Sequence, residues 1–154
     1  MSDQAEQPVF TIEKVYVKDL SLELPNAPQV FLENQAPQVD VQLGSSADAI
    51  REGLYECVLT LTVTAKAGDK TYFLVEVAQA GIFQIRNIPP GDLDPILGIA
   101  CPNILFPYGR EVVADLIARG GFPPVHLAPI NFEAVYAQRL QESRGGGPKI
   151  EIAH

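Results

Sequence analysis

Few side chains in this 154-residue chain are of the types that carry out catalysis or bind metals. The two histidines are His126 and His154, and the two cysteines are Cys57 and Cys101. A cysteine nucleophile acts as a thiolate and usually has a base beside it, but no histidine lies near Cys101 in the sequence. A zinc site built from Cys and His needs ligands at suitable spacing, and none occurs here. The sequence therefore favours packing roles for both cysteines over catalysis by Cys101. It predicts a protein that is not an enzyme and has neither a metal nor a cofactor.

Two further groups have structural explanations. Asp92 and Asp94 precede an expected helix, where carboxylates offset the positive N-terminal end of the helix dipole. Asp94 is also a plausible N-cap, because Pro95 suits the first helical position. The three glycines at 145–147 lack the Lys-Ser or Lys-Thr pair of a phosphate-binding loop.

Three carboxylates on two expected strands form the most promising binding surface. Side chains two residues apart in a strand point to the same face. Asp19 and Glu23 therefore share a face of one strand, and Leu74 and Glu76 share a face of another. If the two strands are near neighbours, these four side chains lie together on an outward sheet face. Such a face could bind a basic partner through charge complementarity, or it could simply be solvated.

Four stretches of alternating apolar and polar residues must position these side chains. Strands are expected at residues 9–24, in a short stretch at 39–43 that ends at Gly44-Ser45-Ser46, and at 54–65 and 71–85. A change of parity in the first strand predicts a β-bulge near Glu13 and Lys14. The short links between strands favour an antiparallel sheet.

The hydrophobic period changes towards that of a helix after residue 91. Pro102 and Pro107 are expected to break or kink this part, and a better helix spans residues 108–119 and ends at Gly120-Gly121. Asn131 is the expected N-cap of a second helix at 132–142. That helix carries an apolar stripe of Phe132, Val135, Tyr136 and Leu140.

Composition and order predict a single α+β domain, a four-stranded antiparallel sheet followed by two helices. The domain is expected to span residues 9–142, between flexible tails at 1–8 and 143–154. The formal net charge of −8 argues against binding nucleic acid or an anionic membrane through a general field. No apolar run approaches the roughly 18 residues of a membrane span, and the polar N-terminus does not read as a secretory signal. We therefore expect a cytoplasmic protein.

Several blocks of the sequence resemble the SecB family of bacterial protein-export chaperones. The longest is residues 101–136, from Cys-Pro-Asn-Ile-Leu-Phe-Pro-Tyr-Gly-Arg-Glu to Asn-Phe-Glu-Ala-Val-Tyr. The others are Val15-Tyr16-Val17-Lys18-Asp19-Leu20-Ser21, Pro25-Asn26-Ala27-Pro28 and Gln79-Ala80-Gly81-Ile82-Phe83. They follow one another in the order of the family, from about residue 9 to residue 141.

This resemblance implies an ATP-independent chaperone that keeps secretory precursors unfolded and passes them to the motor protein SecA. It implies a homotetramer built as a dimer of dimers, with long apolar grooves for unfolded chains. The positions implied to dock SecA are Asp19, Glu23, Leu74 and Glu76. Phe31, Phe132, Tyr136 and Leu140 are the expected groove residues, although each could instead close the protomer's own core. Val112, Val113 and Leu116 are the expected interface residues.

Two other functions compete with this interpretation. One is a SecB-like chaperone devoted to a single client such as an antitoxin, but the acidic SecA-docking pattern argues against it. The other is a small-molecule-binding protein with an enclosed apolar pocket, which a stable monomer would favour.

Overall fold

A computed structural model describes residues 7–144 and 152–153 of the chain. Four long strands are present: β1 (Val9–Glu23), β2 (Gln38–Arg51), β3 (Leu54–Ala67) and β4 (Lys70–Arg86). A helical segment follows them, made of the 3-10 turn η3 (Pro90–Asp92), α1 (Leu93–Pro95), the π-helical η4 (Ile96–Ala100) and α2 (Cys101–Arg119). The remaining elements are a 3-10 turn η2 (Gln29–Leu32), the helix α3 (Phe132–Arg144) and a two-residue strand β5 (Ile152–Ala153).

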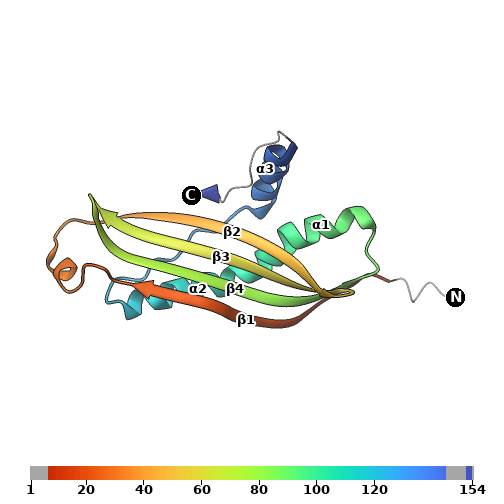
Figure 1. Cartoon of the computed structure of the whole chain (residues 1–154), viewed down its shortest axis with the longest axis horizontal. Coiled ribbons are helices and arrows are strands. Elements are labelled where there is room, and N and C mark those ends of the chain that lie inside the picture. Colours follow the sequence, from red (N-terminus) through yellow and green to blue (C-terminus); the bar gives the residue numbers. More distant parts are fainter. Residues whose placement is uncertain (1–6, 145–151, 154) are drawn as a thin grey trace.

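The strands form one antiparallel sheet in the order β1-β4-β3-β2-β5. Tight turns join β2 to β3 and β3 to β4, with Gly53 and Gly68 at positive φ of 77° and 62°. Other residues rarely adopt this backbone conformation. The predicted antiparallel sheet of four strands followed by helices is therefore confirmed, and Figure 1 shows the strands lying side by side in front of α2.

The second strand is longer than the sequence suggested. The prediction that Gly44-Ser45-Ser46 ends it was wrong, because these residues pair with Thr60, Leu59 and Val58 in an unbroken ladder. Backbone groups form the hydrogen bonds of the ladder. The strands β2 and β3 are joined by a tight turn, so their pairing continues even at small residues with a low preference for strands.

Two irregularities shape β1. The register shifts between Ile12 and Lys14, as predicted, and again between Val17 and Asp19, which the sequence did not predict. A bulge adds one residue to a strand and so changes which side chains share a face. The second bulge places Asp19 on the same face as Tyr16, an arrangement that simple alternation would not give.

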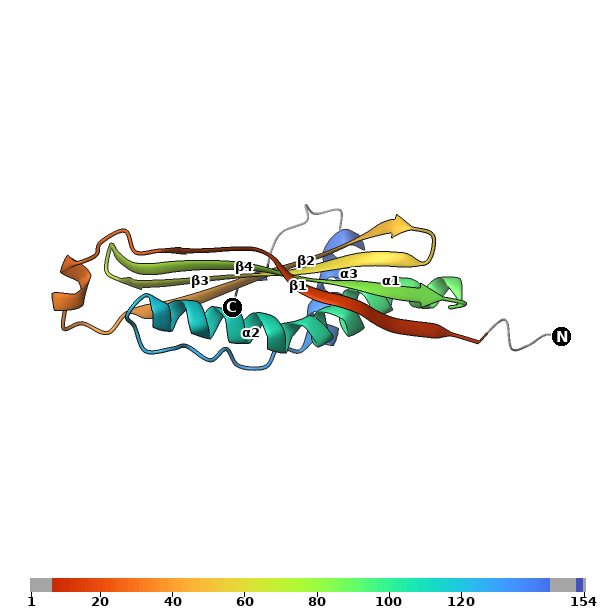
Figure 2. The same ribbon diagram turned by 90° about the horizontal axis from the view of Figure 1, so that it is seen from below.

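The helix α2 covers one face of the sheet, and the opposite face is left open (Figure 2). We call these the inner face and the outer face. The inner face supplies fully buried side chains such as Leu61, Val77 and Phe83, and α2 contributes Leu105, Val113 and Ile117. Gly81 on β4 allows Leu105 to approach closely, since an added Cβ there would lie 3.0 Å from its Cδ2 atom.

The predicted break in the helix is absent. Pro102 closely follows the π-helical η4 in a continuous helical segment, and α2 continues through Pro107 to Arg119. Asp94 is not an N-cap, because the helical segment already begins at Pro90. The predicted end is confirmed: Gly120 caps α2, and Gly121 adopts a φ of 88°.

The helix α3 begins as predicted and extends two residues beyond its expected end. The side-chain oxygen of Asn131 accepts a hydrogen bond of 3.0 Å from the backbone N–H of Ala134. Most of the two predicted tails, residues 1–6, 145–151 and 154, lies outside the described residues. Residues 152 and 153 pair with β2, which the sequence did not suggest.

Candidate functional site

The four residues predicted to form a carboxylate surface lie together on the outer face. Asp19 is paired with Ala78, Ser21 with Glu76, and Glu23 with Leu74 across the β1–β4 ladder. Directly opposite residues share a face, so Asp19, Glu23, Leu74 and Glu76 form one patch, which we call the acidic patch. Its three carboxylates are exposed and Leu74 is half-buried.

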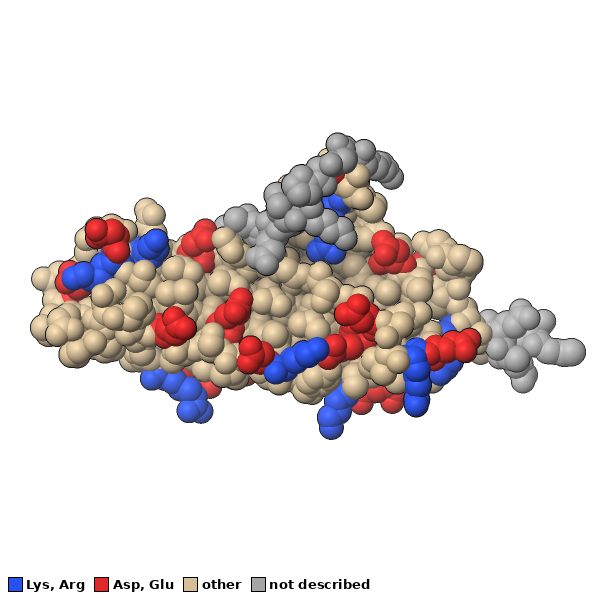
Figure 3. All heavy atoms as spheres, viewed as in Figure 1, with Lys and Arg blue, Asp and Glu red and all other residues tan. Residues whose placement is uncertain are grey.

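The neighbouring strand β3 lines the acidic patch with threonines. Thr62 pairs with Glu76, and its hydroxyl donates a 3.2 Å hydrogen bond to a carboxylate oxygen of Glu76. The contact holds the carboxylate across the sheet surface, where an approaching cation can reach it. Figure 3 looks onto the outer face and shows acidic side chains spread over the sheet.

A second polar cluster adjoins the acidic patch. Tyr16 and Lys18 of β1 reach over β4 to Glu56 of β3: the Tyr16 hydroxyl donates a very short hydrogen bond to the carboxylate, and Lys18 Nζ lies 2.9 Å from it. The bonds from Lys18 and Tyr16 lower the pKa of Glu56. Desolvation and the hydrogen bond to Glu56 raise the pKa of Tyr16 to about 12. Sequence reasoning missed this cluster because it depends on the register of three strands.

The residues expected to line one client groove do not converge. Phe31 lies on η2, where its ring stacks on Phe122 at 5.2 Å between centroids. Phe132 is only 3 % exposed and packs against Phe106, so it belongs to the core. A core position leaves no ring surface for a client, and the assignment of Phe132 to the groove is corrected on that ground.

Tyr136 and Leu140 lie in a different hollow. They line a pocket of about 400 Å³ between α3, η4 and β2. The Tyr136 hydroxyl donates a 2.7 Å hydrogen bond to Asp94, which raises the pKa of Tyr136, and its ring lies against Gly98. Tyr136 thus joins α3 to the preceding helical segment while part of it stays accessible.

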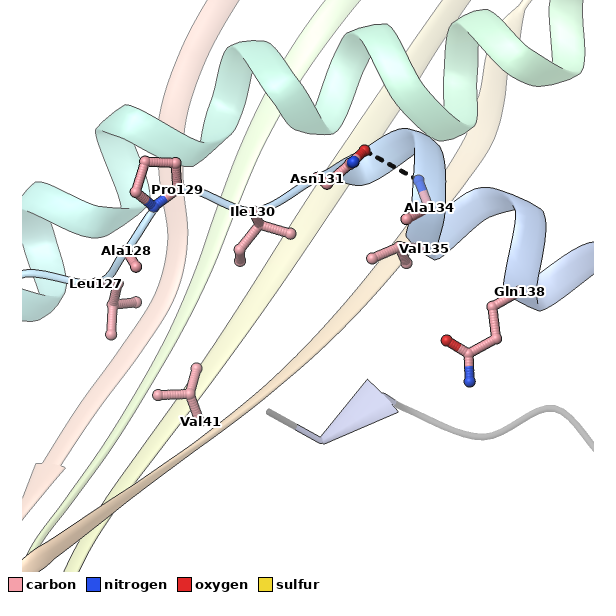
Figure 4. Close-up of a pocket in the computed structure, with 9 residues that line it drawn as sticks. All are labelled: Val41, Leu127, Ala128, Pro129, Ile130, Asn131, Ala134, Val135 and Gln138. Carbon is pink, nitrogen blue, oxygen red and sulfur yellow. Dashed lines mark hydrogen bonds between the residues drawn. The ribbon is translucent and has the colours of Figure 1, made fainter.

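A larger apolar pocket of about 480 Å³ opens at the edge of β2 (Figure 4). We call it the β2 pocket. The loop before α3 and the first turns of α3 form one wall, and Val41 of β2 faces them. The lining residues are Val41, Leu127, Ala128, Pro129, Ile130, Asn131, Ala134, Val135 and Gln138. None of them is charged, so the pocket suits apolar side chains. The apolar run Leu127-Ala128-Pro129-Ile130 was the signal in the sequence that could have pointed to it.

Of the three expected interface residues of α2, two lie in the core and one remains partly accessible. Val113 is fully buried and Leu116 is 8 % exposed within a single chain, so both assignments are corrected, because such residues have almost no surface left to bury in a contact. Val112 stays half-buried and lines a pocket between α2 and β1 with Val15, Val17 and Tyr108.

The two cysteines pack in the core, as predicted. Both are buried, and a hydrogen bond to Cys57, together with desolvation, raises the pKa of Cys101. The thiol therefore stays neutral, which does not suit a nucleophile. Among residues 7–144 and 152–153, no three His, Cys, Asp or Glu side chains are grouped so as to hold a metal ion. Within that same part of the chain, no helix combines the length and the apolar character needed to cross a membrane.

Among solved structures, this chain is similar in fold to a SecB-like chaperone of Mycobacterium tuberculosis in complex with an antitoxin peptide, with a TM-score of 0.66 and 17 % sequence identity. The match covers 79 % of this chain and 90 % of that chain. At this identity the similarity concerns the fold alone.

Sequence comparisons define the family. The family model for preprotein translocase subunit SecB matches residues 3–143. The protein-export protein SecB of Chromobacterium violaceum is 65 % identical over 148 residues, which are 95 % of this chain and 99 % of that protein. The SecB of Dechloromonas aromatica is 58 % identical over 150 residues, 97 % of this chain and 99 % of that protein. This chain therefore belongs to the SecB family of protein-export chaperones.

Proposed function

We propose that the protein binds unfolded precursor proteins in the cytoplasm, keeps them competent for translocation and delivers them to SecA. The observation that carries the proposal is the acidic patch. Four positions that the family resemblance assigns to SecA docking come from two distant parts of the sequence, and the β1–β4 register brings all four onto one open face. A solvated sheet face would not require that coincidence.

Charge supports this docking mode. The patch presents three exposed carboxylates, with the half-buried Leu74 at the end that holds Glu23. This arrangement suits a basic partner segment with an apolar contact at one end. Long-range attraction of that kind speeds association and fixes orientation.

Unfolded clients bind elsewhere in this proposal. The β2 pocket, which is lined mainly by apolar groups, and the hollow beside Tyr136 and Leu140, which has a mixed lining that includes Asp94 and Arg139, lie on either side of α3. Phe31, which is 49 % exposed, offers a further apolar contact at the η2 end. An apolar pocket such as the β2 pocket can accept many sequences.

Assembly into a homotetramer, a dimer of dimers, completes the proposal. Four apolar side chains of β1 on the inner face remain more than a third exposed: Phe10, Ile12, Val17 and Leu20. A second copy that covers this edge would bury the apolar surface.

The test is binding of an unfolded protein. Reduced and alkylated α-lactalbumin, which cannot refold, is incubated with the protein, and the mixture is separated by sizing chromatography. We expect a stable complex that forms without ATP and also retains SecA when SecA is added. A protein that elutes as a free monomer and binds no unfolded chain would contradict the proposal and would favour a small-molecule carrier.

A further inference from the structure

The outer edge of β2 carries a segment of the same chain. Ile152 pairs with Leu43 and Ala153 with Gln42, and the pairing is antiparallel. The remaining twelve residues of β2, which spans Gln38–Arg51, have no partner on this edge among the described residues. An unpaired strand edge is a template for another extended chain.

The occupied stretch adjoins the β2 pocket. Val41 of β2, which lines the pocket, directly precedes Gln42. Figure 4 shows the short arrow of β5 beside β2, below Gln138 and close to the pocket wall formed by α3. An extended peptide that paired along β2 here would place alternate side chains towards Val41 and the pocket, the usual geometry of strand addition.

We propose that β5 is an autoinhibitory strap, which occupies the edge of β2 and must leave before an extended client segment can pair there. The inference builds on the proposed client-binding function and adds a control within the chain itself. A segment of the same chain competes at an effective concentration in the millimolar range when the connection is short. The strap therefore lowers the apparent affinity of every ligand that pairs with this edge.

The short length of β5 makes the strap displaceable. It pairs at two positions only, whereas a longer client strand can pair along more of β2 and fill the β2 pocket as well. Each additional pair favours the client over the strap, so long unfolded segments with apolar side chains gain access and short peptides do not.

The test compares the full chain with the double variant Ile152→Pro, Ala153→Pro. Proline has no N–H group and cannot continue a ladder. The matched control Ile152→Val, Ala153→Ser keeps both backbone N–H groups. The probe is a fluorescein-labelled ten-residue peptide in which Leu alternates with Ser, and its affinity is measured by fluorescence anisotropy.

We expect the proline variant to bind the peptide about threefold to tenfold more tightly than the wild type, which corresponds to a strap paired roughly 70–90 % of the time. The control variant should bind as the wild type does. A peptide of the same sequence with an N-methyl group on every residue has no backbone N–H to donate to β2 and should show no gain. Equal affinity of wild type and proline variant for the unmethylated peptide would overturn the competition.

Hydrogen exchange without any peptide tests the strap itself. Consecutive amides of β2 point to opposite edges, so one of Gln42 and Leu43 faces β5 and the other faces β3. The amide that faces β5 should exchange faster in the proline variant than in the wild type, and unchanged exchange of both amides would overturn the pairing. Failure of both proteins to bind the peptide and unfolded α-lactalbumin would instead count against the proposed client-binding function. The exchange measurement would still decide whether β5 occupies the edge.

Discussion

At the scale of single residues, the protein separates two kinds of carboxylate on one sheet face. Glu56 is held by Tyr16 and Lys18, so its charge is compensated within the chain. Asp19, Glu23 and Glu76 are exposed, and among the described residues Glu76 bonds the neutral side chain of Thr62 rather than a cation. The uncompensated carboxylates are the ones available to a partner.

Replacing Asp19, Glu23 and Glu76 together with Lys should abolish SecA binding and leave binding of unfolded α-lactalbumin nearly unchanged. Charge reversal turns attraction into repulsion and can cost several kcal/mol at an interface. Isothermal titration calorimetry measures both affinities. In the control, Glu52, Asp69 and Asp92, which are exposed turn residues, are replaced with Lys to give the same change in net charge. Equal SecA affinity in the two triple variants would show that the acidic patch is not the docking site.

The Glu56 cluster predicts a dependence of stability on pH. The folded-state pKa of Glu56 lies below its ordinary value of 4.5, so the folded state favours the ionised carboxylate. Its contribution is present above about pH 4.5 and is lost as the pH falls through the lower folded-state value. A partly exposed ion pair contributes about 1 kcal/mol or less. Glu56→Gln should therefore melt slightly below the wild type at neutral pH.

Scanning calorimetry at neutral pH and at about pH 3 checks this sign. We expect the difference in Tm between Glu56→Gln and the wild type to shrink at the lower pH. Glu52→Gln, a change in an exposed turn, should have little effect at either pH. A difference that stays the same size across this range would mean that ionisation of Glu56 does not contribute to stability.

At the scale of elements, docking of α2 on the sheet depends on a close approach. A Cβ at Gly81 would lie 2.9 Å from Phe83 Cε1, 3.0 Å from Leu105 Cδ2 and 3.2 Å from the backbone oxygen of Lys14. The two side chains are fully buried and the oxygen belongs to a paired strand. None of these neighbours can move freely.

Gly81→Ala should accordingly destabilise the protein by about 1–3 kcal/mol, the usual range for overpacking a core. Urea unfolding monitored by circular dichroism measures the change. Gly91→Ala is the matched control, because nothing lies within 4 Å of the added Cβ there. If both variants were as stable as the wild type, α2 would not be packed against β4 as closely as described.

The attachment of α3 can be tested at Tyr136. Loss of its ring and of the hydrogen bond to Asp94 by Tyr136→Ser should weaken client binding and lower stability by less than the roughly 2–5 kcal/mol typical of a core truncation. Thermal unfolding and affinity for unfolded α-lactalbumin are measured on the same sample. Phe132→Ser provides the comparison, and at this buried position the stability loss should dominate. A large loss of stability in Tyr136→Ser would assign Tyr136 to the core, and unchanged stability with unchanged affinity would remove it from both roles.

At the scale of the whole molecule, the two faces of the sheet suit different contacts. The outer face is open and acidic, and the inner face is covered by α2 except along β1, where apolar side chains stay exposed. A docking partner and a second copy can therefore bind without competing for the same surface.

The proposed tetramer carries four times the formal charge of −8, so screening by salt should favour its assembly. Light scattering at micromolar concentration and physiological salt should show four copies. Val17→Lys with Leu20→Lys should shift the protein to smaller species, whereas Leu32→Lys, at the most exposed apolar residue, should not. A wild type that stays monomeric under these conditions would contradict the tetramer.

Local patterns in the sequence determined much of this protein. Alternation assigned Leu74 and Glu76 to one strand face, Gly120-Gly121 marked the end of α2, and Asn131 marked the start of α3. These features depend on neighbours within a few residues. The local rule failed at Pro107, because α2 continues through this residue although a proline in a helix interior removes one hydrogen bond.

Only the tertiary structure decided which residues from distant segments meet. The β1–β4 register united the acidic patch, a second bulge fixed the face of Asp19, and packing placed Phe132, Val113 and Leu116 in the core. An apolar stripe on a helix predicts that a face is covered, but it does not tell whether the cover is the chain's own sheet, a client or another copy. Pairing of β5 with β2 likewise joins segments that lie about 110 residues apart in the sequence. The pairing uses backbone groups, which every residue type except proline carries in full. Residue types therefore do not reveal which segment pairs with β2.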